Sequence, residues 1–209
     1  MMDNEHLAEA IATQRRGLAE MLHDLPADAW DSQTLCAGWR VREVVAHVTM
    51  PFRYSTARFV REIARSRGNF DRMADRCARR DAQAPPGELL AALRDNERHP
   101  WKPPGGGLEA ALSHDVIHGL DITIALDIAH HVPEDHLRMV LDTITAPQSL
   151  KHFHTDLDGI ELRAEDMDWS FGRGAQIHGP AQELAMILCG RQLPAPRLHG
   201  EGAARFTAA

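Results

Sequence analysis

The chain has 209 residues, of which 44% are hydrophobic and 25% are charged, a composition typical of a globular protein with a buried core. Its formal net charge of -7 disfavours nucleic acid as the main partner, since phosphate binding needs a basic surface. The three cysteines, Cys36, Cys77 and Cys189, are scattered without a Cys-x-x-Cys motif, which argues against a disulfide framework and a cysteine zinc site.

The first sixteen residues, MMDNEHLAEAIATQRR, are polar and amphipathic. We expect no secretory signal, because this segment lacks an apolar run. No stretch of the chain approaches the roughly 18 apolar residues that a membrane span needs. The sequence therefore predicts a protein of the reducing cytoplasm with no membrane partner.

Apolar residues at helical spacing predict a first helix over residues 4–23. A second, longer helix is expected to begin at Trp39 and to end near Gly68, because its apolar stripe continues through this whole segment. Residues 71–83 are strongly charged and ambiguous.

Three further helices are predicted over residues 84–98, 109–128 and 134–145. Between the first two, the segment HPWKPPGGG at residues 99–107 ends in five consecutive helix breakers and predicts a loop.

After residue 150 the hydrophobic pattern changes to short alternating runs. ELRAE, DWSFG and AQIHG are interpreted as strands of a small meander, and a Gly-Pro pair then opens a last helix that ends at Gly190. The predicted organisation is a mainly helical domain over residues 1–150 and a small C-terminal α/β module over residues 151–209.

The segment SHDVIHGLDI carries His114 and His118 four residues apart, followed by Asp121. At this spacing two helical side chains share one face, with Cβ atoms roughly 5–6 Å apart, so both imidazoles can bind one metal ion. Asp121 lies on nearly the same face, where it can orient a ligand or act as a general base. Hydrogen-bonded core histidines are the alternative, because 13 histidines make chance pairs expected.

His47, in the apolar segment VREVVAHVTMP, is the best candidate for a third ligand. Burial disfavours a charged imidazole there, whereas a metal-bound imidazole is neutral. Pro51 removes the hydrogen bond to the carbonyl of His47, so a helix that continues through the proline should bend at the histidine. The same proline can instead end the helix.

Other residues are candidates for contacts with a substrate. An anionic substrate would need an arginine near the metal, and aromatic rings can line a pocket. The candidates are Arg53, Arg173, Arg191, Trp39, Trp101 and Trp169. Solvated arginines and core tryptophans are the alternatives, and Cys36 is interpreted as a buried, inert thiol.

Three segments together resemble the mycothiol-dependent maleylpyruvate isomerase family of the DinB-like metalloenzyme superfamily. They are WDSQTLCAGWRVREVVAHV, SHDVIHGLDI and DMDWSFGRGAQIHGPAQELAMILCGR, in that order along the chain. The resemblance implies a DinB-like four-helix bundle that holds a divalent metal on His47, His114 and His118, with Asp121 and Arg191 as catalytic candidates. The mycothiol branch commonly has glutamate where this chain has His114, but three neutral imidazoles suit zinc, nickel or iron(II).

The resemblance further implies a metal-dependent enzyme, with zinc as the first expectation, that uses a low-molecular-weight thiol such as mycothiol. Its reaction would be transfer to, or cis–trans isomerisation of, an electrophilic small molecule. A homodimer is also possible, because such bundles often associate through a helix face. Two alternatives stay open: a metal-dependent hydrolase, and a non-catalytic binding or stress module in which the metal only stabilises the bundle.

Overall fold

The structure, a computed structural model, describes residues 3–208 as a mainly helical protein with one small sheet. Its α-helices are α1 (Asn4–Asp24), α2 (Val41–Arg53), α3 (Thr56–Arg65), α4 (Phe70–Asp81), α5 (Pro86–Arg94), α6 (Leu108–Thr123), α7 (Glu134–Ile144), α8 (Pro147–Phe153) and α9 (Ala181–Leu188). The strands are β1 (Ile160–Ala164), β2 (Ser170–Gly172) and β3 (Ala175–Gly179). The predicted fold class, mainly α with a small C-terminal α/β module, is confirmed.

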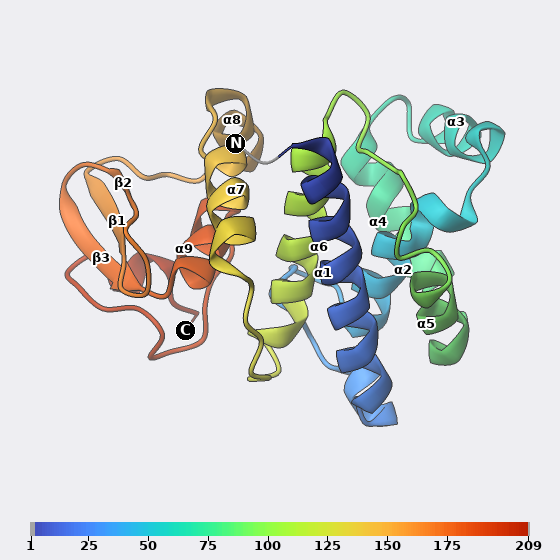
Figure 1. Cartoon of the computed structure of the whole chain (residues 1–209), viewed down its shortest axis with the longest axis horizontal. Helices are drawn as coiled ribbons and strands as arrows, with labels where there is room; N and C mark the ends of the chain where they lie inside the picture. The colour runs from blue at the N-terminus through green and yellow to red at the C-terminus, as the bar shows by residue number, and fades with distance from the viewer. Residues whose placement is uncertain (1–2, 209) are drawn as a thin grey trace.

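Four of the helices form the expected bundle. Helices α1 and α2 each pack against both α5 and α6, so the four close a ring around a common core. Helix α4 covers the outside of α2, α3 packs on α4, and α7 lies on the other side of α6 (Figure 1). This arrangement places α2 and α6, which carry the three candidate histidines, in direct contact.

The prediction of one long helix from Trp39 to Gly68 is wrong, because the chain breaks between α2 and α3. Helix α2 continues through Pro51 but ends two residues later, and Tyr54 is extended with φ −106° and ψ 129°. The hydroxyl of Ser55 then accepts a hydrogen bond from the backbone N–H of Arg58 and caps the new helix. Apolar residues on both helices face the interior, which explains the unbroken stripe.

The ambiguous segment 71–83 forms most of α4. The side chain of Asn69 caps this helix by accepting a hydrogen bond from the backbone N–H of Arg72. A buried stripe of small and sulfur-containing residues lies beneath the charged face: Met73, Ala74, Cys77 and Ala78. These buried residues have helical spacing, but they are only weakly hydrophobic, so the sequence pattern did not predict the helix.

The three strands do not form the predicted meander, because β1 lies in the centre of the sheet. It pairs antiparallel with β2 on one side and parallel with β3 on the other. The chain crosses the start of β1 through Gly172 and Gly174, whose φ angles of 88° and 137° favour glycine. A Cβ atom on Gly174 would lie 2.0 Å from the carbonyl oxygen of Gly159, so this tight crossing needs glycine.

The C-terminal segment shares its core with the helical bundle. One continuous cluster joins buried residues of α1, α6 and α7 to residues of β1, β3 and α9, for example Leu7, Leu112, Leu141, Leu162 and Leu184. The division at residue 150 remains a prediction. Within residues 3–208, none of the helices combines the length and apolar character that crossing a bilayer demands.

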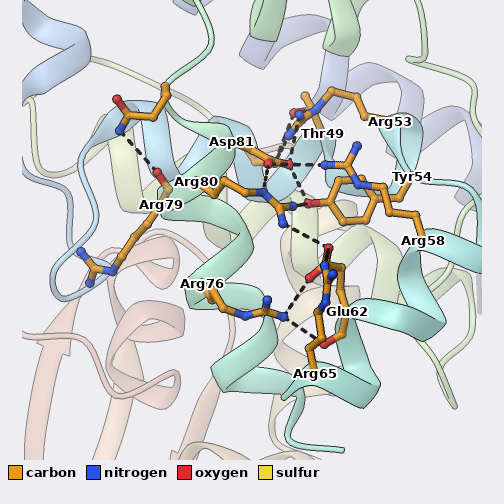
Figure 2. Close-up of polar contacts among 12 residues, drawn as sticks. Thr49, Arg53, Tyr54, Arg58, Glu62, Arg65, Arg76, Arg79, Arg80 and Asp81 are labelled. Atoms are coloured by element: carbon orange, nitrogen blue, oxygen red, sulfur yellow. Dashed lines mark hydrogen bonds and ion pairs between the residues drawn. The ribbon is translucent and has the colours of Figure 1, made fainter. Parts of the chain in front are cut away.

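A polar cluster joins α2, α3 and α4 around two buried carboxylates, Glu62 and Asp81 (Figure 2). Arg80 bridges them, with Nη1 3.1 Å from Oε1 of Glu62 and Nε 2.8 Å from Oδ1 of Asp81. The Tyr54 hydroxyl donates to Oδ2 of Asp81 at 2.7 Å. Burial opposes ionisation, but these contacts outweigh it and hold the pKa of both carboxyl groups below the ordinary range.

We expect Glu62→Gln to lower the free energy of unfolding by about 1–3 kcal/mol at pH 7, because the surrounding guanidinium groups lose a charged acceptor. The pKa of Glu62 is depressed by folding, so its stabilisation is complete above the unfolded pKa of about 4 and is lost as the pH falls towards the folded value. Urea unfolding from pH 7 to pH 3 should therefore show the wild type and the variant converging.

The exposed Glu88 provides the control, and Glu88→Gln should change stability by less than about 0.5 kcal/mol. A difference between wild type and Glu62→Gln that stays constant down to pH 3 would contradict this account of the cluster.

Candidate metal centre

Three histidines from two helices meet in the interior of the protein. His47 of α2 and His114 and His118 of α6 each offer a nitrogen, and these nitrogens all lie within 4.8 Å of one another. The Nε2 atoms of His47 and His114 are 3.1 Å apart. The ring of His118 lies 4.9 Å and 4.8 Å from the other two ring centroids. The predicted triad is therefore assembled by the fold.

Each histidine of α6 is held by a neighbouring carboxylate. The Nδ1 atom of His114 is 2.9 Å from Oδ1 of Asp115, and Nδ1 of His118 is 3.0 Å from Oδ2 of Asp121. An ionised carboxylate only accepts hydrogen bonds, so both Nδ1 atoms carry the proton and both Nε2 atoms keep a free lone pair. This tautomer leaves Nε2 as the metal-binding atom on each ring.

An arginine lies behind each carboxylate. The Nε–H of Arg15, on α1, donates to Oδ2 of Asp115 at 2.7 Å, and the Arg15 side chain is fully buried. The Nε–H of Arg191 donates to Oδ1 of Asp121 at 2.8 Å, and its Nη2 donates to Oδ2 at 3.0 Å. One arginine–carboxylate pair supports His114 from helix α1 of the bundle, and the other supports His118 from the C-terminal segment.

The surroundings set the protonation states. Burial and the neighbouring histidines push the pKa of His47 well below its ordinary value, and burial also lowers the pKa of His118. For Asp115 and Asp121 burial acts in the opposite direction, but hydrogen bonds and arginine charges outweigh it and keep both carboxyl pKa values low. Neutral imidazoles beside ionised carboxylates are the states that a divalent cation requires.

His47 differs from the other two histidines. Its Nδ1 atom is buried and has no hydrogen-bond partner among the described residues. Its ring packs against Trp39, with ring centroids 5.0 Å apart. The imidazole is therefore positioned by packing and offers Nε2 to the centre. A donor set of three imidazole nitrogens fits zinc, nickel or iron(II).

The histidines lie at one wall of a cavity of about 440 Å³. Its other walls are mainly apolar and come from the segment before α2, from α4, α6, α7 and α8, and from the chain just after α9. They include Cys36, Trp39, Phe70, Ile117, Ile144, Phe153 and Arg191. A volume of this size holds a small organic molecule beside the three rings.

The other predicted site residues lie in different places. Arg191 lines the cavity, whereas Asp121 is fully buried behind His118 with both oxygens hydrogen-bonded. Arg53 points away from the centre and donates to the carbonyl of Ala46. Arg173 is exposed in the turn between β2 and β3.

The three candidate tryptophans and Cys36 also lie in different surroundings. Trp39 lines the cavity, the ring of Trp101 lies 5.0 Å from that of His114, and Trp169 stacks on Phe171 beside the sheet. Burial and the charge of Asp121 raise the pKa of Cys36 to about 11, which keeps it a thiol at neutral pH.

Sequence reasoning missed Asp115 and Arg15. Asp115 follows His114 directly, and adjacent helical residues do not share a face, so the spacing gave no signal. Arg15 did leave one, because it lies four residues after Ile11 and three before Leu18, on the apolar stripe of α1. A charged residue on a buried stripe indicates an interior ion pair.

Comparisons with known proteins agree with this architecture. Residues 11–99, which include His47 but not the two α6 histidines, match the family model described as the mycothiol maleylpyruvate isomerase N-terminal domain. No protein of curated function matches the chain significantly in sequence.

Two solved structures share the fold. They are the mycothiol-dependent maleylpyruvate isomerase, with a TM-score of 0.61, and its histidine-to-alanine mutant, with a TM-score of 0.67. Each is 12% identical, and each alignment covers 97% of this chain and 94% of the other. The resemblance seen in the sequence is thus confirmed: residues 11–99 match the model of the mycothiol maleylpyruvate isomerase N-terminal domain, and the chain has the fold of the mycothiol-dependent maleylpyruvate isomerase.

Proposed function

We propose that this protein is a divalent-metal-dependent enzyme that uses a low-molecular-weight thiol of the mycothiol type. Its reaction would be thiol transfer to, or cis–trans isomerisation of, an electrophilic small molecule. One observation carries the proposal: three imidazoles from two helices converge at the wall of a cavity of about 440 Å³. The family model and the fold of the mycothiol-dependent isomerase support the choice of a thiol.

His47, His114 and His118 would hold the metal, with zinc as our first choice and nickel or iron as alternatives. A divalent cation there would lower the pKa of a thiol or water at the site and so supply a nucleophile at neutral pH. The apolar walls of the cavity would exclude bulk water from the reacting groups.

The chain's own residues have separate roles in this proposal. Asp121 keeps the proton of His118 on Nδ1 and fixes Arg191, so we assign it a positioning role. Arg191 uses one N–H of each of its three nitrogens on Asp121 and the Cys189 carbonyl. Two of its five N–H groups remain, and we propose that they contact the substrate.

Metal analysis and calorimetry test the proposal together. Protein from metal-replete medium should contain about one divalent ion per chain. Titration of this protein with mycothiol, bacillithiol and glutathione should give binding heat with one of them. Heat with none of the thiols would shift the proposal to a hydrolase, and protein without divalent metal would overturn it.

A further inference from the structure

A second cavity, of about 570 Å³, lies next to the histidine cavity. It is formed by the end of α2, the start of α3 and α4, and the loop at residues 99–107. The residues that line it are Met50, Pro51, Tyr54, Ser55, Thr56, Phe59, Phe70, His99, Trp101 and Pro104. It is large enough to bind a small organic ligand.

The two cavities share a wall. Phe70 lines both of them, and of two consecutive prolines, Pro103 lines the first and Pro104 the second. Trp101, which lines the second cavity, packs against His114 with ring centroids 5.0 Å apart. A ligand in the second cavity would therefore lie within reach of the histidine centre.

The second cavity is lined by aromatic and neutral groups. Among its lining residues as the structure describes them, none carries a carboxylate, an ammonium or a guanidinium group. The hydroxyl of Tyr54 is used by Asp81 and Arg80, and the guanidinium of Arg58 lies over one face of its ring, 3.8 Å from the centroid, so the remaining ring surface lines the cavity. Burial and the charge of Arg15 lower the pKa of His99, so this imidazole is neutral as well.

The histidine cavity has one arginine, Arg191, and one histidine outside the triad, His152, among its described lining residues. Its arginine, Arg191, is already paired through two hydrogen bonds with Asp121, and Asp71 adds a carboxylate. A carboxylate would find no charged partner among the described residues that line the second cavity, and so little compensation for its desolvation there. Aromatic walls instead favour flat, neutral groups.

We infer that the second cavity binds the neutral aromatic or apolar part of the electrophilic substrate, beside the histidine centre. That the ligand is an electrophile rests on the proposed function. Binding of a neutral aromatic molecule does not, because none of the described residues that line this cavity is a proposed metal ligand.

Binding of a neutral probe tests the cavity directly. N-phenyl-1-naphthylamine should bind the purified full-length protein with increased fluorescence, whether or not metal is present. Phe59→Arg, a half-buried residue of the lining, should weaken this binding by about tenfold or more, because it places a charge beside the probe. Thr56→Arg, at an exposed lining position, should weaken it in the same direction and guards against misfolding of the first variant.

Val60→Arg is the matched control, because it adds the same charge to the same helix at a side chain that is 59% exposed and outside the lining. It should leave probe affinity within about twofold of the wild type. Equal probe affinities in the wild type and in all three variants would overturn the inference.

The second measurement compares two acceptors of thiol transfer, neutral 1-chloro-2,4-dinitrobenzene and anionic 4-chloro-3,5-dinitrobenzoate. In both, sulfur bonds to the ring carbon that carries chlorine, chloride leaves with the bonding electrons, and the thiol proton passes to solvent. The wild type should favour the neutral acceptor in kcat/KM, and Phe59→Arg should reduce that preference by about tenfold.

The outcomes separate the two proposals. Preference for the anionic acceptor, unchanged by Phe59→Arg, would overturn the inference while leaving the thiol enzyme intact. Transfer to neither acceptor, together with the expected probe binding, would count against the proposed function and support the cavity assignment.

Discussion

Replacing His118 by alanine should reduce bound divalent metal from about one ion per chain to a small fraction of that, and abolish any thiol-dependent activity. Two imidazoles would remain, and two ligands do not complete a tetrahedral protein site. The helix should survive, because alanine is the best helix former and His118 is already a slightly exposed residue on α6. Elemental analysis of the dialysed protein, with circular dichroism as the check on folding, measures both effects.

Two companion variants sharpen this result. His178→Ala removes a histidine of β3 that hydrogen-bonds Gln176 outside the centre, and metal content should not change. Asp121→Asn removes the charge that orients His118, and metal affinity should fall by about 10–100-fold without being lost. Full metal content in His118→Ala would contradict the proposed ligand set, whatever the other variants show.

Replacing Arg15 by methionine should lower the free energy of unfolding by about 3–5 kcal/mol, the largest stability effect expected in this chain. The guanidinium is fully buried, and its removal leaves the charge of Asp115 without its closest cation. The carbonyl of His99, 2.7 Å from Nη1, would lose its donor as well. Urea unfolding monitored by circular dichroism, with and without a chelator, separates this effect from any release of metal.

The neighbouring arginine is the control. Arg16 forms an ion pair with Glu97 at 3.1 Å, but its side chain is 41% exposed. Arg16→Met should therefore change stability by no more than about 1 kcal/mol. If Arg15→Met lowered the free energy of unfolding no more than Arg16→Met, the buried pair of Arg15 and Asp115 would not have the stabilising role proposed for it.

The pair of Arg191 and Asp121 makes the C-terminal segment part of the site. Arg15 reaches Asp115 from the first helix, and Arg191 reaches Asp121 from just beyond α9. Two carboxylates of α6 are therefore bound by arginines from opposite ends of the chain. From the sequence, Arg173 and Arg191 of the C-terminal module were candidates for contacts with a substrate. The fold places Arg191 in the cavity wall, and through Asp121 it also anchors His118.

Much of the fold followed from local patterns in the sequence. The helices α1, α5, α6 and α7, the loop at residues 99–107 and the final helix were predicted near their observed positions. So was the pairing of His114 with His118 on one face. These features depend on residues within one or two turns of each other, which is the range over which apolar spacing and helix caps act.

Other features were decided by packing between distant segments. The break after α2 and the central position of β1 depend on which surfaces each element covers, and an apolar stripe or an alternating run is the same in either arrangement. The ion pairs of the site join residues 100 and 70 positions apart in the chain. No local period encodes such pairs, because they form only when burial of the helices brings two charged groups out of water together. The second cavity arises in the same way, from α2, α3, α4 and a loop that meet only in the folded protein.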